Sequence, residues 1–176
     1  ATLGLDSIVV RELLNNEKND RDELVGTVFG LKILGAGLVL LILSIAIYFT
    51  SNDYSTNVLI FIVASGTIFQ SFNVIDLYFQ SKVLSKYVVI ANTISLLVSS
   101  IIKVILILNE APLIAFAIAT IIDTLIVAIG LIYFYQKIDS RRLQDWKFST
   151  IKSKSLLKQS WPMILSGVAI SLYMKI

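Results

Sequence analysis

The fold is decided by one stretch, residues 87–135, which reads YVVIANTISLLVSSIIKVILILNEAPLIAFAIATIIDTLIVAIGLIYFY. It holds two apolar runs, 88–108 and 113–135, joined by the short turn 109–112. A helix rises 1.5 Å per residue and needs roughly 20 apolar residues to cross a bilayer core about 30 Å thick. Each run is long enough, so the stretch predicts a pair of membrane-spanning helices.

Each run carries one lone charge, Lys103 in the first and Asp123 in the second. A central charge costs about 3 kcal/mol on insertion scales, whereas each Leu, Ile, Val or Phe returns about 0.3–0.6 kcal/mol, so both runs still insert. The two charges differ in depth by roughly 7–8 Å at 1.5 Å per residue, and a snorkelling lysine reaches away from Asp123. We therefore expect no direct ion pair, and a partner for each on another helix or in a cavity.

Composition extends this interpretation to the whole chain. Hydrophobic residues make up 56% and charged residues 15%, with a mean hydropathy of +0.83, which is typical of a multi-span helical protein. There is no Cys and no His, which excludes disulfides, thiol nucleophiles and the usual zinc or haem ligands. We expect no metal and no cofactor.

Two further spans, 24–49 and 58–79, precede the central pair, and another begins at Ser160. The predicted fold is an all-α integral membrane protein, a helical bundle with four complete spans and a partial one at each end. We expect the chain to be a fragment. Residues 1–23 are predicted to be the tail of an earlier span entering an aqueous loop, Lys32 to snorkel to the interface, and Gly26 and Gly30 to admit another helix closely.

The segment 136–159 is the longest hydrophilic one and mixes basic residues with Trp146, Phe148, Leu156 and Leu157. This mixture predicts an amphipathic piece on an anionic membrane face. Trp161 is expected at the interface, with Pro162 at a helix start. Basic residues fill 1–23, 80–87 and 136–159 and are absent from 50–57 and 109–112, so the positive-inside rule places the three basic segments in the cytoplasm.

Polar residues form stripes along three helices at 100° per residue. The stripes are Gly66, Gln70, Asn73, Asp76 and Gln80; then Asn92, Ser95, Ser99 and Lys103; then Thr120, Asp123 and Thr124. They either bond helix to helix in a packed bundle or line a hydrated cavity for a polar solute. We favour the cavity, because ionisable residues inside membranes usually face pathways.

No nucleophile with a base, no paired carboxylates at helical spacing and no phosphate-cradling glycine loop stand in the sequence, so we expect no catalytic residues and no enzyme. Nucleic-acid binding is not expected either, because no recognised binding module accompanies the basic residues.

Three stretches carry a family resemblance: LGLDSIVVREL at 3–13, DLYFQ at 76–80 with Lys86 and Tyr87 after it, and LLKQSWP at 156–162. In these the chain resembles the Wzx-type O-antigen flippases, the polysaccharide-exporter branch of the multidrug/oligosaccharidyl-lipid/polysaccharide (MATE-like) superfamily. The resemblance implies a transporter of two six-helix halves. Residues 1–135 would then end the first half, 136–159 would be the cytoplasmic link, and 160–176 would begin the second half.

The resemblance also implies the activity: alternating-access translocation of an undecaprenyl-diphosphate-linked oligosaccharide across the cytoplasmic (inner) membrane of a bacterium or archaeon. Arg11, Lys103 and Lys175 are predicted to offset the diphosphate charge. Asp76 or Asp123 is predicted to couple transport to a cation. The substrate-path candidates are Arg11, Asp76, Asn92, Ser99, Lys103, Asp123 and Lys175. Two alternatives stay open, a multidrug exporter of the same superfamily and a non-transporting membrane scaffold.

Overall fold

The structure is a computed structural model that describes residues 5–15, 18–50, 53–139 and 143–174. Its helices are α1 (Leu5–Asn15), α2 (Lys18–Phe49), α3 (Tyr54–Gln70), α4 (Val74–Ser81), α5 (Lys86–Leu108), α6 (Leu113–Asp139) and α7 (Thr150–Tyr173), with 3₁₀ turns η1 (Ser71–Asn73) and η2 (Leu143–Asp145). Four segments are long and apolar enough to cross a membrane: Asp20–Phe49, Tyr54–Ser81, Lys86–Leu108 and Leu113–Ile138. The prediction of an all-α, multi-pass membrane protein with four complete spans is confirmed.

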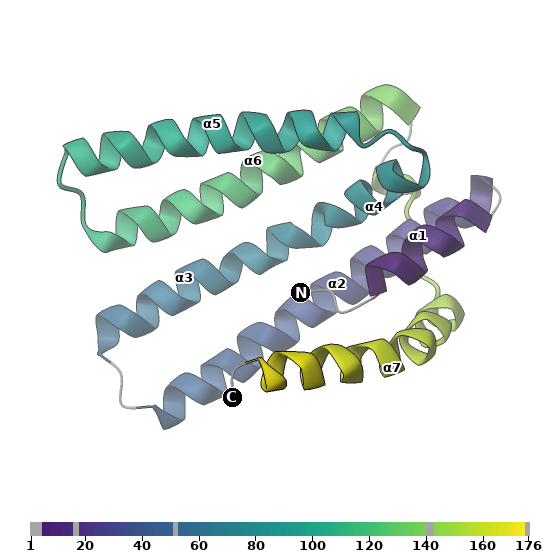
Figure 1. Cartoon of the computed structure of the whole chain (residues 1–176), viewed down its shortest axis with the longest axis horizontal. Helices are drawn as coiled ribbons and strands as arrows, with labels where there is room; N and C mark the ends of the chain where they lie inside the picture. Colours follow the sequence, from purple (N-terminus) through teal and green to yellow (C-terminus); the bar gives the residue numbers. More distant parts are fainter. Residues whose placement is uncertain (1–4, 16–17, 51–52, 140–142, 175–176) are drawn as a thin grey trace.

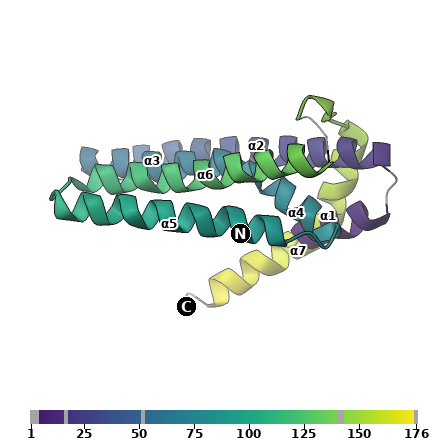
Figure 2. The same cartoon turned by 90° about the horizontal axis from the view of Figure 1, so that it is seen from above.

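The long helices run side by side in the order α2, α3, α6, α5, and neighbours in this order make the most extensive contacts (Figures 1 and 2). Short α1 packs on α4 and α7 at one end of the bundle. That end also holds the α4–α5 turn and the start of α7 (Figure 1). We call it the basic end, after Lys82, Lys86, Lys137 and Lys147, and the opposite end the far end.

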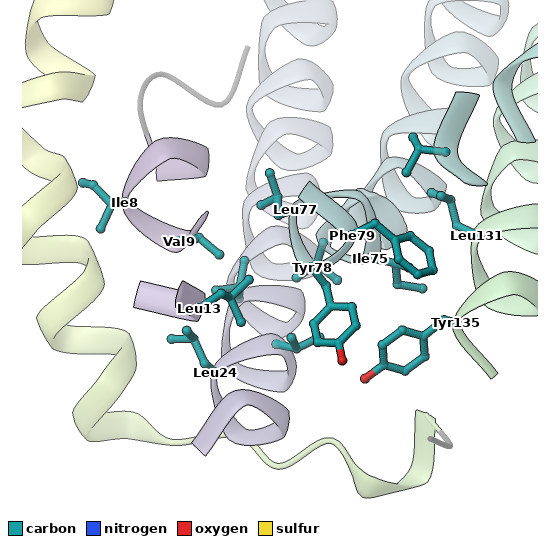
Figure 3. Close-up of a cluster of buried hydrophobic side chains, with 14 of the residues drawn as sticks. Ile8, Val9, Leu13, Leu24, Ile75, Leu77, Tyr78, Phe79, Leu131 and Tyr135 are labelled. Carbon is teal, nitrogen blue, oxygen red and sulfur yellow. The ribbon is translucent and has the colours of Figure 1, made fainter. Parts of the chain in front are cut away.

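The buried core lies at the basic end (Figure 3). Tyr78 of α4 and Tyr135 of α6 are fully buried and meet edge to face, with ring centroids 5.2 Å apart. Other members of the core share complete or nearly complete burial: Val9, Leu13, Val25, Val28, Val74, Ile75, Phe79 and Leu131. Because α1, α2, α4 and α6 all contribute, this core joins the short helices to the long ones.

The far half of the bundle is exposed apolar surface. Leu41 and Ile42 of α2 and Leu96 and Ile101 of α5 are all more than half exposed. Apolar side chains are stable against lipid, because they do not contact water there and because the helix hydrogen-bonds its own backbone groups. The apolar surface of the far half is therefore of the kind that faces lipid.

Both ends of α5 are flanked by turns of the same design. After α4, Leu84 N–H donates to Phe79 O (2.8 Å) and Val83 N–H to Gln80 O (3.1 Å). After α5, Ala111 and Glu110 repeat the pattern. This is the Schellman motif, which needs a left-handed residue and usually has Gly there. Here Val83 and Glu110 take φ of 58° and 50°, so both turns are made without Gly.

An irregular segment before α7 lies across α2, and we call residues 146–149 the strap. A Cβ on Gly26 would lie 2.7 Å from Lys147 O, and one on Gly30 would lie 2.7 Å from Phe148 Cδ2. The two glycines were predicted to admit another helix, and that prediction is wrong. They admit the strap, because only a bare backbone leaves room for it.

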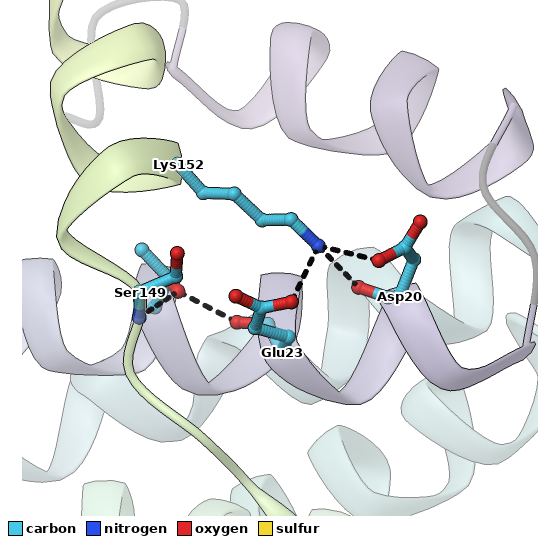
Figure 4. Close-up of polar contacts among 5 residues, drawn as sticks. Asp20, Glu23, Ser149 and Lys152 are labelled. Carbon is cyan, nitrogen blue, oxygen red and sulfur yellow. Dashed lines mark hydrogen bonds and ion pairs between the residues drawn. The ribbon is translucent and has the colours of Figure 1, made fainter.

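The strap continues into a polar clamp (Figure 4). Ser149 N–H donates to Thr27 Oγ1 (3.0 Å), and Lys152 Nζ lies 2.9 Å from both Asp20 Oδ1 and Glu23 Oε2. Burial lowers the pKa of Lys152, but hydrogen bonds to Asp20 and Glu23 outweigh it, so the pKa is raised above its usual value of 10.5. The start of α7 is thereby fixed to α2.

The first segment differs in part from expectation. Residues 5–15 form α1, with Val9 and Leu13 at 0% exposure, and residues 18–23, expected in an aqueous loop, form the start of α2. That α1 is the tail of an earlier span stays a prediction. The apolar side chains of α1 recur at helical spacing and face α4 and α7. Charged residues stand among them in the sequence, so the apolar pattern is hard to recognise there.

The start of the last helix also differs from expectation. It lies at Thr150, so Pro162 is inside α7 and not at a helix start. Trp146 and Leu156, predicted to lie on the membrane face, pack inward: Trp146 contacts Phe29 with centroids 5.0 Å apart, and Leu156 is 2% exposed. Phe148 and Leu157 of the same segment stay exposed, so only part of its apolar surface is withdrawn into the core.

Candidate functional site

Two adjoining cavities open beside the core, and three residues line both of them: Gln70, Asn73 and Asp76. The smaller has a volume of about 240 Å³ and lies among α3, α4, α5 and α6; the larger, about 680 Å³, lies among α1, α2, α3 and α4. We call them the small and the large compartment, and the two together the groove. The large compartment has the size of an ordinary ligand pocket.

The three residues that line both compartments lie where the second span changes from α-helix to 3₁₀ helix and back. The α-helix stops at Gln70, makes the 3₁₀ turn η1 and resumes at Val74, whereas the sequence predicted one continuous helix over 58–79. A 3₁₀ turn inside a helix often marks a functional hinge. Ser71 within it is 2% exposed, and its hydroxyl has no hydrogen-bond partner among the described residues.

The large compartment contains an ion pair that sequence reasoning missed. Lys32 Nζ lies 3.3 Å from Asp6 Oδ1, and the lysine side chain is only 11% exposed. The prediction that Lys32 snorkels to the interface is wrong, because the opposite charge on α1 holds it inside. A signal was present, since Lys32 is a lone charge within an apolar run, as Lys103 and Asp123 are.

The small compartment is lined by two carboxylates, each held by one side chain. Gln80 Nε2 donates to Asp76 Oδ1 (3.0 Å). The Ser95 hydroxyl contacts both the carbonyl oxygen (2.8 Å) and the carboxylate Oδ1 of Asp123. Asn92 and Thr124 line the same compartment. Polar groups from α3, α4, α5 and α6 thus line one space, while Ser95 of the same stripes bonds α5 to α6.

The remaining candidates from the sequence lie elsewhere. Ser99 is 3% exposed on the face of α5 that also carries Ser95, outside both compartments. Lys103 is half-buried, lines neither compartment and, within the described residues, forms no ion pair with Asp123, as expected. Arg11 is exposed and donates to Gln159 Oε1 (3.3 Å). Lys175 lies outside the described residues.

The structure therefore brings Asp76, Asn92 and Asp123 together and leaves Arg11, Ser99 and Lys103 apart. Between the core and the far half, the groove offers carboxylate acceptors, amides that donate and accept, hydroxyls and one cation. In the described part of the chain, no three acidic residues gather into a metal-binding group. This set suits a polar, hydroxyl-rich solute with an anionic part.

The family model described as "Polysaccharide biosynthesis protein" matches residues 1–176. No curated protein and no solved structure matches the chain significantly.

Proposed function

Because the chain belongs to the polysaccharide biosynthesis protein family, the family of the Wzx-type polysaccharide and O-antigen flippases, we propose that it takes part in flipping an undecaprenyl-diphosphate-linked oligosaccharide. The cargo is an O-antigen, capsule or exopolysaccharide repeat unit. It crosses the cytoplasmic membrane of a bacterium or archaeon by alternating access, without chemical change. The basic end faces the cytoplasm.

The observation that carries the proposal is the groove itself. A scaffold needs only packed helices, yet here polar side chains from six helices, α1 to α6, line open space within or beside the spans. Leaving polar groups unpaired inside a bilayer is costly, and such groups mark solute pathways. The groove favours a carrier over a non-transporting scaffold.

Lys32 is the cation that the groove offers to the diphosphate. Its charge is balanced by Asp6, so an arriving diphosphate can replace the carboxylate as its partner. Such an exchange keeps Lys32 in a charge-assisted hydrogen bond throughout. In this proposal Lys32 has the role that was predicted for Arg11 and Lys103, which lie outside the groove; the role predicted for Lys175, outside the described residues, stays a prediction.

A multidrug exporter of the same superfamily is the rival. A groove for cationic, aromatic drugs calls for aromatic walls and unbalanced carboxylates. No aromatic side chain lines either compartment in the residues that the structure describes. The amides and hydroxyls there favour a sugar.

Transport in proteoliposomes tests the proposal with a matched pair of variants of the full-length protein. With a fluorescent lipid-linked oligosaccharide, Lys32→Gln lowers the initial rate about tenfold or more, and Lys103→Gln changes it by less than about twofold. Asp6→Asn, which frees Lys32, retains transport and shows that losing the ion pair alone does not cause the defect. Equal rates for Lys32→Gln and wild type would refute the role of Lys32, and ethidium export without glycan transport would favour the drug exporter.

Coupling to a cation is a separate part of the proposal, with Asp76 and Asp123 as candidates. Both carboxylates line the small compartment, and a carboxylate facing a hydrated space inside the membrane can bind and release a cation. Asn substitutions at these positions are expected to uncouple transport from the ion gradient. Gradient-driven transport that persists in both variants contradicts this part.

A further inference from the structure

The two compartments differ in charge. The large one is lined by Lys32, whereas no lysine or arginine of the described residues lines the small one. Its ionisable liners are Asp76 and Asp123. The large compartment also contains Asp6 and Asp76 beside Lys32, so the small compartment, with two carboxylates and no cation among the described residues, is the more anionic of the two.

Each carboxylate in the small compartment is fixed by a protein partner and retains an acceptor. Gln80 holds Asp76 at Oδ1, and Ser95 holds Asp123 at Oδ1. Among the described residues, the other carboxylate oxygen of each has no hydrogen-bond partner. An ionised carboxylate accepts hydrogen bonds at both of its oxygens. The second oxygen of Asp76 and that of Asp123 therefore remain available to hydroxyl donors of a ligand.

The compartment also has an apolar side. Val88 on α5 lies one turn nearer to the basic end than Asn92, and Val127 on α6 lies one turn nearer than Asp123. Leu131 of the core follows Val127 on the same helix. Polar groups and an apolar floor together match a sugar ring, which has hydroxyls around its edge and a C–H face.

The volume sets the size of the ligand. At roughly 30 Å³ per water molecule, the compartment of about 240 Å³ has room for about eight waters. That is far more than a bare metal ion occupies and close to what one monosaccharide fills.

We propose that the small compartment binds one uncharged sugar residue of the lipid-linked glycan and selects against acidic sugars there. The inference rests on the proposed function and adds the identity of the sugar to it. Hydroxyls of the sugar donate to Asp76 and Asp123, and its C–H face lies on Val127. A uronic acid would bring a third carboxylate beside these two, and like charges repel each other more strongly inside a protein than in bulk water.

The test uses the full-length protein in proteoliposomes and two lipid-linked oligosaccharides that differ only in one sugar, a hexose or the matching hexuronic acid. Wild type transports the neutral substrate about tenfold faster or more. The double variant Asp76→Asn, Asp123→Asn reduces that preference about tenfold while still transporting the neutral substrate. Asp53→Asn, an exposed carboxylate outside the groove, leaves the preference unchanged.

A gain-of-function variant keeps the proposal testable if the double variant misfolds. Asn92→Lys adds a cation to the compartment and is expected to shift the preference toward the hexuronic acid. If wild type shows no preference for the neutral substrate, the inference alone is overturned. The same holds if both variants keep the wild-type preference while they still transport the neutral substrate. Loss of gradient dependence with an unchanged sugar preference also overturns it, because the carboxylates then serve a cation. If wild type moves neither substrate, the proposed function itself fails.

Discussion

The basic end and the far half of this bundle are built from the same helices but are held together differently. At the basic end, α1, α4, the strap and the start of α7 bury Tyr78, Tyr135 and their neighbours. In the far half, large apolar side chains of α2 and α5 stay exposed. The groove lies where one region gives way to the other. The difference indicates that the packed end holds the groove in shape, while the far half depends on lipid for its surroundings.

The largest effect on the free energy of unfolding is expected from truncating an isoleucine to alanine in the core, and the same substitution in the far half is the comparison. Ile75→Ala leaves a cavity in the core, where Ile75 is 0% exposed, and is expected to cost about 2–5 kcal/mol in the free energy of unfolding. Ile101→Ala, at a site 60% exposed, should change it by less than about 0.5 kcal/mol. Denaturant titration of the full-length protein in bicelles measures both. Equal losses would remove the distinction between the two regions.

The next largest effect on stability is expected from replacing glycines of α2, one under the strap and one away from it. Gly26→Leu adds a side chain whose Cβ would lie 2.7 Å from Lys147 O, and forcing it in should cost about 1–3 kcal/mol. Gly37→Leu is the control, since nothing lies within 4 Å of the place its Cβ would take. Proteolysis should also cut near the strap faster in the first variant. Strap protection that matches wild type would show that the strap does not need Gly26.

The two Schellman turns compare the ends directly. A left-handed conformation costs a residue with a Cβ about 1–2 kcal/mol, and most for a β-branched one. Val83→Gly at the basic end is therefore expected to stabilise the protein by about 1 kcal/mol, and Glu110→Gly at the far end by less. Thermal unfolding of the two variants provides the readout. A Val83→Gly protein that unfolds at a lower temperature than wild type contradicts the turn assignment.

The smallest effect is expected from the clamp. Lys152 is 25% exposed and pairs with two partly exposed carboxylates, so Lys152→Met should cost less than about 1 kcal/mol. Because the pKa of Lys152 is raised on folding, its contribution is complete below about pH 10 and is lost as pH rises through the folded-state pKa. Unfolding measured against pH should show the variant and wild type converging there. Lys154→Met, at an exposed position on the same helix, controls for lost charge.

Part of this structure could be predicted from residues alone. Apolar runs predicted the four spans, and 100° spacing placed Gln70, Asn73 and Asp76 on one side of their helix, because a helix determines its own faces. Which helix meets a face depends on tertiary packing. The Asp6–Lys32 pair and the strap over Gly26 both join segments far apart in sequence, so neither could be derived from local patterns. The break at η1 contains neither Gly nor Pro and gave no signal.

The central claim is that the groove is a hydrated path and not a sealed seam between helices. The chain has no cysteine, so single cysteines can be added to it and labelled with a membrane-impermeant thiol reagent. We predict that Asn73→Cys, which lies in both compartments, reacts and is protected by lipid-linked oligosaccharide, whereas lipid-facing Ile101→Cys does not react. If Asn73→Cys resists labelling from both sides of the membrane while an exposed Asp53→Cys reacts, the groove is not a path for solute.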